Sequence, residues 1–364
     1  MTSVKEITSL LEEFAPLSLQ EDYDNAGLIC GNPQAEVHSI LLTLDITEEV
    51  IDEAIREGHN LIISHHPLLF QSIKNLRPDS AEKRCILKAI QHNLNIYSAH
   101  TNIDSVRHGV SGKMAEKLGL THTHILQPTG KLYSFTFYTP QCEAERVRTA
   151  LLNIGAGHIG NYSHCSFNSM GSGTFQAQET AHPYVGEIGK LHTESEIKTE
   201  ITVPEHLLSK CIQLLKDVHP YEEPVWNAIC LNNTNPTTGF GIIGELPTPI
   251  ETQAFLLKVK EIFQCKAIRH TAICHPKVQR IAVCGGSGAS FISTAIAQKA
   301  DLYITGDCKY HDFFKADNKL IIADIGHYES EQYTKEIFYE LVTKKIPNFA
   351  IQFSKVITNP IHYI

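Results

Sequence analysis

Two adjacent histidines are the first residues in this sequence whose types and spacing could do chemistry. Ser64, His65, His66 and Pro67 end the predicted strand NLIISHH. Side chains at the carboxyl end of a parallel strand point into the crevice where α/β proteins bind ligands. Neighbouring side chains on a regular strand face opposite ways, so both histidines serve one site only if the strand breaks or two ions share them. Pro67 favours a break, because it removes a donor and restricts His66. Two polar residues decorating a strand end are the alternative interpretation.

Two further pairs combine a histidine with a carboxylate four residues later. His100 and Asp104 follow a short predicted strand in NIYSAHTNID, and His327 and Glu331 follow another in IIADIGHYESE. Residues four apart lie on one face of a helix, which can bring both side chains to one metal centre. One such pair is a weak signal, because the spacing is common by chance. Two pairs in matching positions, together with the histidine pair, predict a shared metal site.

The residue types restrict which metal such a site would take. Imidazole and carboxylate ligands without sulfur suit zinc, the first expectation here, and also iron, manganese, cobalt or nickel. Five or six ligands exceed one tetrahedral zinc, which predicts two divalent ions per chain, about 3.5–4 Å apart. Glu331 has two oxygens and could bridge both ions. Water held between them would have a lowered pKa and act as a nucleophile.

The elements that position these residues form a repeated pattern. Residues 37–64 and 278–305 each run strand, turn, helix, strand, the plan of a βαβ unit. In the first copy, Thr47 is the expected N-cap of the helix and Gly58 lies just past its end. We therefore expect an α/β fold in which two similar halves, residues 1–128 and 236–364, enclose a di-metal cleft.

The segment between these halves, residues 129–235, has a different pattern. Strands are expected in LYSFTFYTP, TFQAQET, KTEITVPEH and VWNAICLNN, and helices in EAERVRTALLNIGAG and HLLSKCIQLLKDVHP. This order predicts an inserted ferredoxin-like α+β domain. Its flanks, LQPTGK and NNTNPTTG, have linker-like composition.

Composition excludes several classes of function. The formal net charge is −9 and no run of Lys and Arg is longer than Lys344-Lys345, so nucleic acid is not an expected partner. The amino terminus is polar, and no apolar stretch approaches the roughly 20 residues of a membrane span. A cytoplasmic protein without a membrane partner is expected. The 10 cysteines contain no CxxC pair and are expected to be reduced, buried and structural.

Several other polar residues are weaker candidates. The turn GGSGAS, Gly285 to Ser290, could contact phosphate, but a tight turn that requires glycine is the favoured interpretation. Loop residues of the first half could line the cleft, hold a ligand histidine or simply form surface turns: Asp24, Asn25 and Asp45. Residues of the second half that correspond to the histidine pair could contact substrate or support the site: Asp307, His311 and Asp312.

The inserted segment contains its own histidines. The run from His219 to Glu223, HPYEE, could be a separate ligand site, but a packed turn is favoured. His158, His164 and His182 lie in glycine-rich loops and could shape the mouth of an enclosed space. No Ser-His-Asp or Cys-His arrangement stands out, since His164 and Cys165 are only sequence neighbours.

The motifs DNAGLICGNP, ISHHPLLF, SAHTNID, TGDCKYHD and GHYESE occur in this order over nearly the whole chain. Together they resemble the Nif three-like family, whose bacterial members carry the label GTP cyclohydrolase I type two homologue. GAGHIGNYSHCSF and HPYEEPVW are similar to the PII- or CutA-like insertion of its longer bacterial members. The resemblance implies a homohexamer whose toroidal shell encloses the metal sites. It also implies a di-metal centre with these ligands: His65, His66, Asp104, His327 and Glu331. His100 would support a ligand or transfer protons.

The expected function is that of a metal-dependent hydrolase acting on a small nucleotide-like or cyclic amide substrate. A metal-bound hydroxide would attack a carbon or phosphorus centre, and His100 would manage proton transfer. Opening of the GTP imidazole ring follows from the family label alone. A non-catalytic protein that buffers, delivers or senses divalent metal is the alternative, and a scaffold with a structural metal is a third. An open coordination position and a substrate-sized pocket would separate enzyme from metal carrier.

Overall fold

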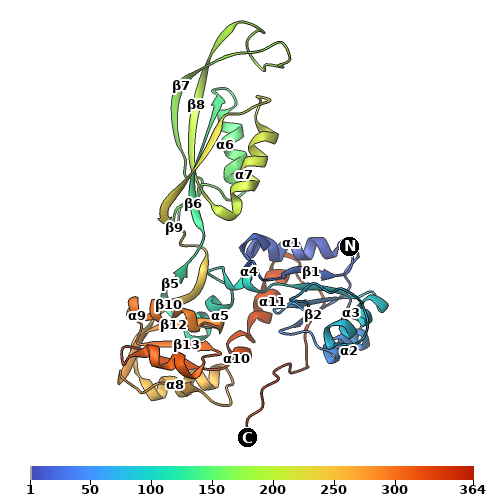
Figure 1. Cartoon of the computed structure of the whole chain (residues 1–364), viewed down its shortest axis with the longest axis vertical. Coiled ribbons are helices and arrows are strands. Elements are labelled where there is room, and N and C mark those ends of the chain that lie inside the picture. The colour runs from blue at the N-terminus through green and yellow to red at the C-terminus, as the bar shows by residue number, and fades with distance from the viewer. Residues whose placement is uncertain (1) are drawn as a thin grey trace. The chain divides into compact units, whose positions relative to one another are not determined.

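The computed structural model of the protein describes residues 2–364, which fold as two compact units. The main unit combines residues 2–128 with 237–364, and the inserted unit is 129–236. Figure 1 labels many of the elements of both. The main unit is a mixed α/β structure built around two sheets, and the inserted unit contains a third sheet.

The first sheet of the main unit has the strand order β1-β4-β3-β2-β15. Its strands are β1 (Gly27–Cys30), β4 (Asn95–Ser98), β3 (Leu61–Ser64), β2 (Ile40–Thr43) and β15 (Ile351–Phe353). All pairs are parallel except β1 with β4. The helices that precede or connect these strands are α1 (Val4–Phe14), α2 (Glu48–Glu57) and α3 (Ala81–Gln91). The central strands are fully buried, as expected for parallel strands that are covered on both faces.

Local sequence signals explain the boundaries of α2. The Thr47 side chain accepts a hydrogen bond from the Val50 N–H, and Gly58 ends the helix with a left-handed φ of 80°. Both roles were predicted from the sequence and are confirmed. A residue with a Cβ would be strained at Gly58, because the left-handed region is open mainly to glycine.

The second sheet of the main unit has the order β11-β14-β13-β12-β10-β5. Its strands are β11 (Arg269–His270), β14 (Ile321–Asp324), β13 (Leu302–Gly306), β12 (Lys277–Ser287), β10 (Gly239–Glu251) and β5 (Thr121–Pro128). The strands β12, β13 and β14 are parallel, and the others pair antiparallel. The remaining helices of this unit are α4 (Thr101–Asp104), α5 (Val110–Leu118), α8 (Thr252–Ile262), α9 (Ile292–Ala297), α10 (His327–Glu331) and α11 (Thr334–Lys345), with 3-10 turns η1 (Leu17–Leu19), η2 (Ala289–Phe291) and η3 (Tyr310–Ala316).

The two 28-residue copies found in the sequence fold alike. In each, a strand, a helix and a second strand form a parallel pair: β2-α2-β3 in one and β12-α9-β13 in the other. Each pair continues into a third parallel strand, β4 or β14. The three short segments that carry the candidate ligands therefore all leave the carboxyl ends of parallel strands, where side chains from neighbouring strands converge.

The inserted unit has the element order β6-α6-β7-β8-α7-β9, which matches the order expected from the sequence. Its elements are β6 (Lys131–Pro140), α6 (Ala144–Asn153), β7 (Phe167–Gln176), β8 (Leu191–Pro204), α7 (Glu205–Val218) and β9 (Trp226–Thr234). The sheet order β7-β8-β6-β9 is antiparallel throughout. Phe135, Phe137, Val147, Leu151 and Leu215 are fully buried between this sheet and its two helices.

One predicted strand of the inserted unit is misplaced. The expected strand TFQAQET overlaps only the end of β7, which begins at Phe167 and ends at Gln176. The earlier part of β7, NSMGSG, is polar or small apart from Met170 and is mostly exposed, so it carries no alternating apolar signal. Its strand conformation comes from pairing along its whole length with β8.

All 10 cysteines are free, in agreement with the expectation of reduced thiols. Their burial was only partly predicted, because Cys142 and Cys230 are exposed. No helix of residues 2–364 is both long enough and apolar enough to cross a membrane.

Candidate metal centre

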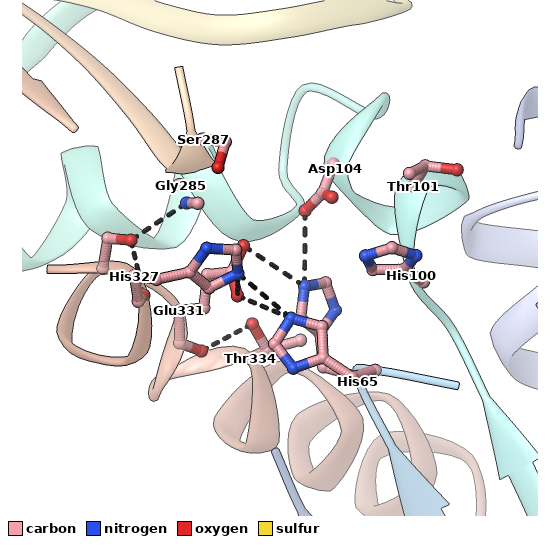
Figure 2. Close-up of polar contacts among 12 residues, drawn as sticks. His65, His100, Thr101, Asp104, Gly285, Ser287, His327, Glu331 and Thr334 are labelled. Carbon is pink, nitrogen blue, oxygen red and sulfur yellow. Dashed lines mark hydrogen bonds and ion pairs between the residues drawn. The ribbon is translucent and has the colours of Figure 1, made fainter. Parts of the chain in front are cut away.

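The carboxyl ends of three parallel strands gather the candidate ligands in the main unit. His65 and His66 follow β3, His100 follows β4, and His327 begins α10 directly after β14. Figure 2 shows His65, Asp104, His327 and Glu331 directed toward a common centre, with His100 beside it. His65 is fully buried and Glu331 is 3% exposed, so the centre is largely withdrawn from water.

Glu331 lies between two groups of ligands and presents one oxygen to each. Its Oε1 lies 3.5 Å from His65 Nε2, whereas its Oε2 lies 3.0 Å from both His66 Nε2 and His327 Nε2. On the side of His65, Asp104 Oδ1 lies 3.8 Å from His65 Nε2. On the other side, His66 Nε2 and His327 Nε2 are 3.2 Å apart. A carboxylate that faces two imidazole groups in this way can share its oxygens between two neighbouring positions.

The described residues contain three groups whose ligand atoms lie within 4.8 Å of one another and could hold a metal ion. These groups are His66-His327-Glu331, His65-Asp104-Glu331 and His65-His66-His100. They overlap, so the site is one continuous cluster of imidazole and carboxylate. It includes all five ligands predicted from the sequence, and their role as metal ligands stays a prediction.

The cluster contains polar atoms that the protein itself does not satisfy. His65 Nε2 and Asp104 Oδ1 are buried and lack a hydrogen-bond partner among the described residues. An unsatisfied buried polar group costs free energy, and such groups are rare in folded proteins unless an ion or water completes them. Their lone pairs fit a divalent cation, so the residues present are compatible with the metal that the donor set implies.

Each histidine of the cluster has an oxygen atom within hydrogen-bond distance of its Nδ1. His65 Nδ1 lies 2.9 Å from the Ala99 carbonyl oxygen, and His66 Nδ1 lies 2.7 Å from Asp45 Oδ1. An oxygen that accepts from Nδ1–H fixes the tautomer, which leaves the Nε2 lone pair free to point at the centre. This second layer is the arrangement that orients metal-binding histidines in proteins.

The same arrangement is found at the other two histidines. His327 Nδ1 lies 2.8 Å from Asp307 Oδ2, and His100 Nδ1 lies 2.8 Å from Asp24 Oδ1. Asp24 also accepts hydrogen bonds from the Thr101 backbone and hydroxyl. The sequence left open whether Asp24 and Asp45 line the cleft, hold a histidine or form surface turns, and whether Asp307 contacts substrate or supports the site. The structure shows that Asp24, Asp45 and Asp307 all contact a histidine of the cluster.

Electrostatics in the metal-free cluster favour the protonated forms of His66 and His327. Burial alone would lower the pKa of His66, but hydrogen bonds to Asp45 and Glu331 outweigh it and raise the pKa to about 9. His327 behaves alike: burial opposes the shift, and Asp307 and Glu331 raise its pKa to about 11. Burial and the nearby Glu331 charge raise the pKa of Asp104 to about 8. Burial would raise the pKa of Glu331, but the histidines around it hold this pKa well below its usual value.

The glycine turn makes room for the central carboxylate. A Cβ added at Gly286, whose φ is +61°, would lie 2.3 Å from Glu331 Oε1. The Gly285 and Gly286 N–H groups donate to the Ser111 and Ser330 hydroxyls. Because these amides are already paired, the geometry supports the tight-turn interpretation of GGSGAS over a phosphate cradle.

Some sequence-based expectations differ from the structure. His100 precedes α4 as its N-cap, so it does not share a helical face with Asp104, whereas His327 and Glu331 do share one turn of α10. His311 and Asp312 are not in the cluster; Asp312 pairs with Lys315 at 2.7 Å.

Sequence reasoning missed three contributors to the site. The Phe70 ring lies 5.6 Å from the His100 ring and is 52% exposed, and the Thr358 hydroxyl donates to Asp45 Oδ2 at 2.5 Å. The Ala99 carbonyl, which accepts from His65, is the third. Phe70 closes the ISHHPLLF motif, so its position was a usable signal. Nothing in the local sequence marks Thr358, which is distant along the chain.

The protein is a mixed α/β protein that gathers histidine and carboxylate side chains at the ends of its strands. The pattern of the family described as Duf34/NIF3 (NGG1p interacting factor 3) matches residues 2–360. The chain belongs to this family. It is 37% identical to a GTP cyclohydrolase 1 type 2 homolog of Halalkalibacterium halodurans, with 98% of each chain covered. It is 35% identical to the homolog of that name from Bacillus subtilis, covering 99% of this chain and 98% of the relative.

Solved structures agree with this assignment. The crystal structure of a Bacillus cereus protein related to NIF3 shares 38% identity with this chain and superposes with a TM-score of 0.84, covering 100% of this chain and 99% of the other. Staphylococcus aureus protein SA1388 shares 30% identity with a TM-score of 0.76, over 100% and 99% of the two chains. Both likenesses extend over the main and the inserted units.

Proposed function

We propose that the protein binds two divalent metal ions, zinc first among them, and hydrolyses a small nucleotide-like substrate. The observation that carries this proposal is the position of Glu331, whose two oxygens face separate imidazole groups. One ion would be held by His66, His327 and Glu331, and the other by His65, Asp104 and Glu331. Divalent ions bound there supply Lewis acidity and lower the pKa of a water molecule.

His100 is the candidate for proton transfer. Its Nδ1 is held by Asp24, so Nε2 is the nitrogen left to exchange a proton with a reacting group. Its ring lies 5.3 Å from the rings of both His65 and His66, beside the cluster. Asp24 also accepts hydrogen bonds from the Thr101 backbone N–H and hydroxyl. Its own pKa is held well below the usual value: burial opposes this shift, but the hydrogen bonds from His100 and Thr101 outweigh it.

An exposed aromatic ring supports a nucleotide-like substrate. Phe70 stands edge to face with His100 at 5.6 Å and is half exposed, so it offers a flat apolar surface next to the polar cluster. Bases stack on such rings, a contact worth about 1–3 kcal/mol. The curated relatives carry the name GTP cyclohydrolase 1 type 2 homolog, which makes GTP the first substrate to test.

Metal content and turnover test the proposal together. Elemental analysis of the native chain should give about two divalent ions per chain, and Glu331→Gln should lose most of them while staying folded by circular dichroism. Glu53→Gln is the matched control, because Glu53 is also a buried carboxylate but accepts from Ser354 and the Lys355 N–H instead. Unchanged metal content in folded Glu331→Gln would refute the shared site.

His100→Gln separates chemistry from binding. We expect this variant to keep its metal and to lose about 10²- to 10⁴-fold in turnover of GTP or a related nucleotide, the usual contribution of a general acid or base. Metal-loaded native protein that turns over no nucleotide would refute hydrolysis and favour the alternative function, a carrier or sensor of divalent metal.

We further propose that the inserted unit is a PII/CutA-like module and that the chain assembles as a homohexamer. Apolar side chains on the strands of its sheet support a contact with another copy: Phe167 is 67% exposed and Met170 is 70% exposed. Light scattering coupled to size exclusion should give a mass about six times the 40.6 kDa of one chain. A monomeric mass would refute the assembly without affecting the metal site.

A further inference from the structure

The inserted unit has a pocket of its own beside the HPYEE turn. The pocket has a volume of about 440 Å³, within the range of small-molecule sites, and all of its lining residues belong to this unit. The turn itself is held by His219, whose Nε2 lies 2.8 Å from the Tyr138 carbonyl oxygen and whose Nδ1 accepts from the Tyr221 N–H. Both ring nitrogens are therefore engaged, which supports the packed-turn interpretation of this motif and fixes Tyr221 at the pocket wall.

Aromatic rings form much of this wall. The Tyr221 ring lies 6.1 Å from the Phe175 ring and 6.3 Å from the Tyr184 ring, at interplanar angles of 60° and 53°. Phe175, Tyr184 and Tyr221 all line the pocket. The face of an aromatic ring carries partial negative charge, so several such faces favour a cation.

The pocket wall carries only negative formal charges when His182, the histidine that lines it, is neutral. Glu196, Glu222 and Glu223 line the pocket, and no Lys or Arg does. In the described part of the chain, none of these three carboxylates has a Lys or Arg within ion-pair distance. Nearby acids are already paired, such as Glu194 with His192 and Glu200 with Lys198, both at 2.9 Å. An anionic ligand would be repelled here.

Glu196 is held in place by its surroundings. Its Oε1 accepts a hydrogen bond from the Tyr221 hydroxyl at 3.0 Å. A Cβ added at Gly173 would lie 2.3 Å from Glu196 Oε2, so the glycine leaves the room that this carboxylate occupies. The N–H of His182 donates to Glu222 Oε1 at 3.1 Å, which ties the loop carrying Tyr184 to the HPYEE turn. Burial and the Glu196 charge raise the pKa of Tyr221, so the phenol stays a neutral donor to the carboxylate.

We propose that this pocket binds a small organic cation, with an alkylated ammonium group against the rings of Phe175, Tyr184 and Tyr221 and its charge balanced by Glu196. Aromatic rings and a carboxylate are the combination by which proteins recognise quaternary ammonium groups. The site belongs to the inserted unit alone and does not depend on the metal function proposed for the main unit.

Choline and its neutral carbon isostere, 3,3-dimethylbutan-1-ol, test the proposal on the full-length protein. The two probes have the same shape and differ in charge, so calorimetry with each isolates recognition of the cation. We expect saturable binding of choline and binding of the isostere at least about tenfold weaker. No choline binding, or equal binding of both probes, would overturn the proposal.

Two variants and a control locate the binding. Tyr184→Leu and Glu196→Gln should each weaken choline binding by about five- to thirtyfold. Glu187→Gln removes an acid of the same unit that pairs with Lys190 and does not line the pocket, so it should bind choline like the native chain. Fluorescence of Trp226, the single tryptophan, which packs 5.8 Å from the Phe135 ring, checks that each variant keeps the core of the unit. Equal losses in Glu187→Gln and Glu196→Gln would overturn the proposal, because the effect would then be general to negative charge.

Discussion

Removing the carboxylate behind His66 should weaken metal binding without touching a ligand. Asp45 Oδ1 lies 2.7 Å from His66 Nδ1 and holds that ring with its Nε2 toward Glu331. Loss of such a partner typically reduces metal affinity by about 10- to 100-fold, or about 1.4–2.8 kcal/mol. Asp45→Ala removes both the charge and the acceptor, so we expect its effect near the upper end of this range. Asp45→Asn keeps an acceptor oxygen but no charge, so about tenfold is expected.

A third, milder variant changes Thr358, which contacts the other carboxylate oxygen of Asp45. The Thr358 hydroxyl donates to Asp45 Oδ2 at 2.5 Å, which orients the carboxylate without contacting His66. Thr358→Val removes this donor at nearly constant volume and should weaken metal binding by less than Asp45→Asn does. The order Asp45→Ala, Asp45→Asn, Thr358→Val, from largest to smallest loss, follows from the chain of contacts leading to the imidazole.

A competition titration against a chromophoric zinc chelator measures these affinities. Asp52→Asn is the control, since Asp52 pairs with Lys88 on the surface of α2 and has no contact with the cluster. Native affinity in a folded Asp45→Ala variant would refute the argument that this carboxylate orients a ligand. Equal losses in Asp52→Asn and Asp45→Asn would show that the effect comes from overall charge.

Four more outcomes follow from the structure. The pKa values of His66 and Asp104 are raised to about 9 and about 8, so both groups hold protons in the metal-free fold. Because a bound metal must displace these protons, zinc affinity should rise about tenfold per pH unit for each proton released, until the pH reaches these values. The same protons stabilise the metal-free fold at low pH, and this contribution to its stability is lost as the pH rises toward 9. A zinc affinity and a thermal unfolding temperature that do not change between about pH 6 and 8 would contradict both statements. Gly286→Ala should reduce the metal content per chain, because the added Cβ would lie 2.3 Å from Glu331 Oε1. If elemental analysis gives this variant the metal content of the native protein, the backbone of the turn must shift to accept the Cβ. Phe338→Ala should lower the free energy of unfolding by about 3–5 kcal/mol in urea titration, since this ring is fully buried, and a loss below about 1 kcal/mol would contradict its place in the core.

Much of the candidate site could be predicted from the sequence because local rules place its residues. The histidine pair follows a strand, and the His327 and Glu331 pair spans one helical turn, so each short segment carries its geometry in its own spacing. The same holds for the helix α2, whose Thr47 cap and Gly58 end are defined by neighbouring residues. Where the local signal was weak, as in the strand β7, the prediction failed because pairing with β8 determines the structure there.

The sequence by itself determined the kinds of residue at the cluster and the strand ends that carry them. Only the tertiary structure decided that Glu331 lies between two imidazole groups and which aspartate holds which histidine. The contact of Thr358 with Asp45 had no signal in the sequence, and the HPYEE motif did not show that Phe175 and Tyr184 join Tyr221 around one pocket. The physical reason is that spacing along a chain fixes geometry only within one strand or one helix. Contacts between separate segments of the chain depend on how sheets and helices pack, which no local pattern specifies.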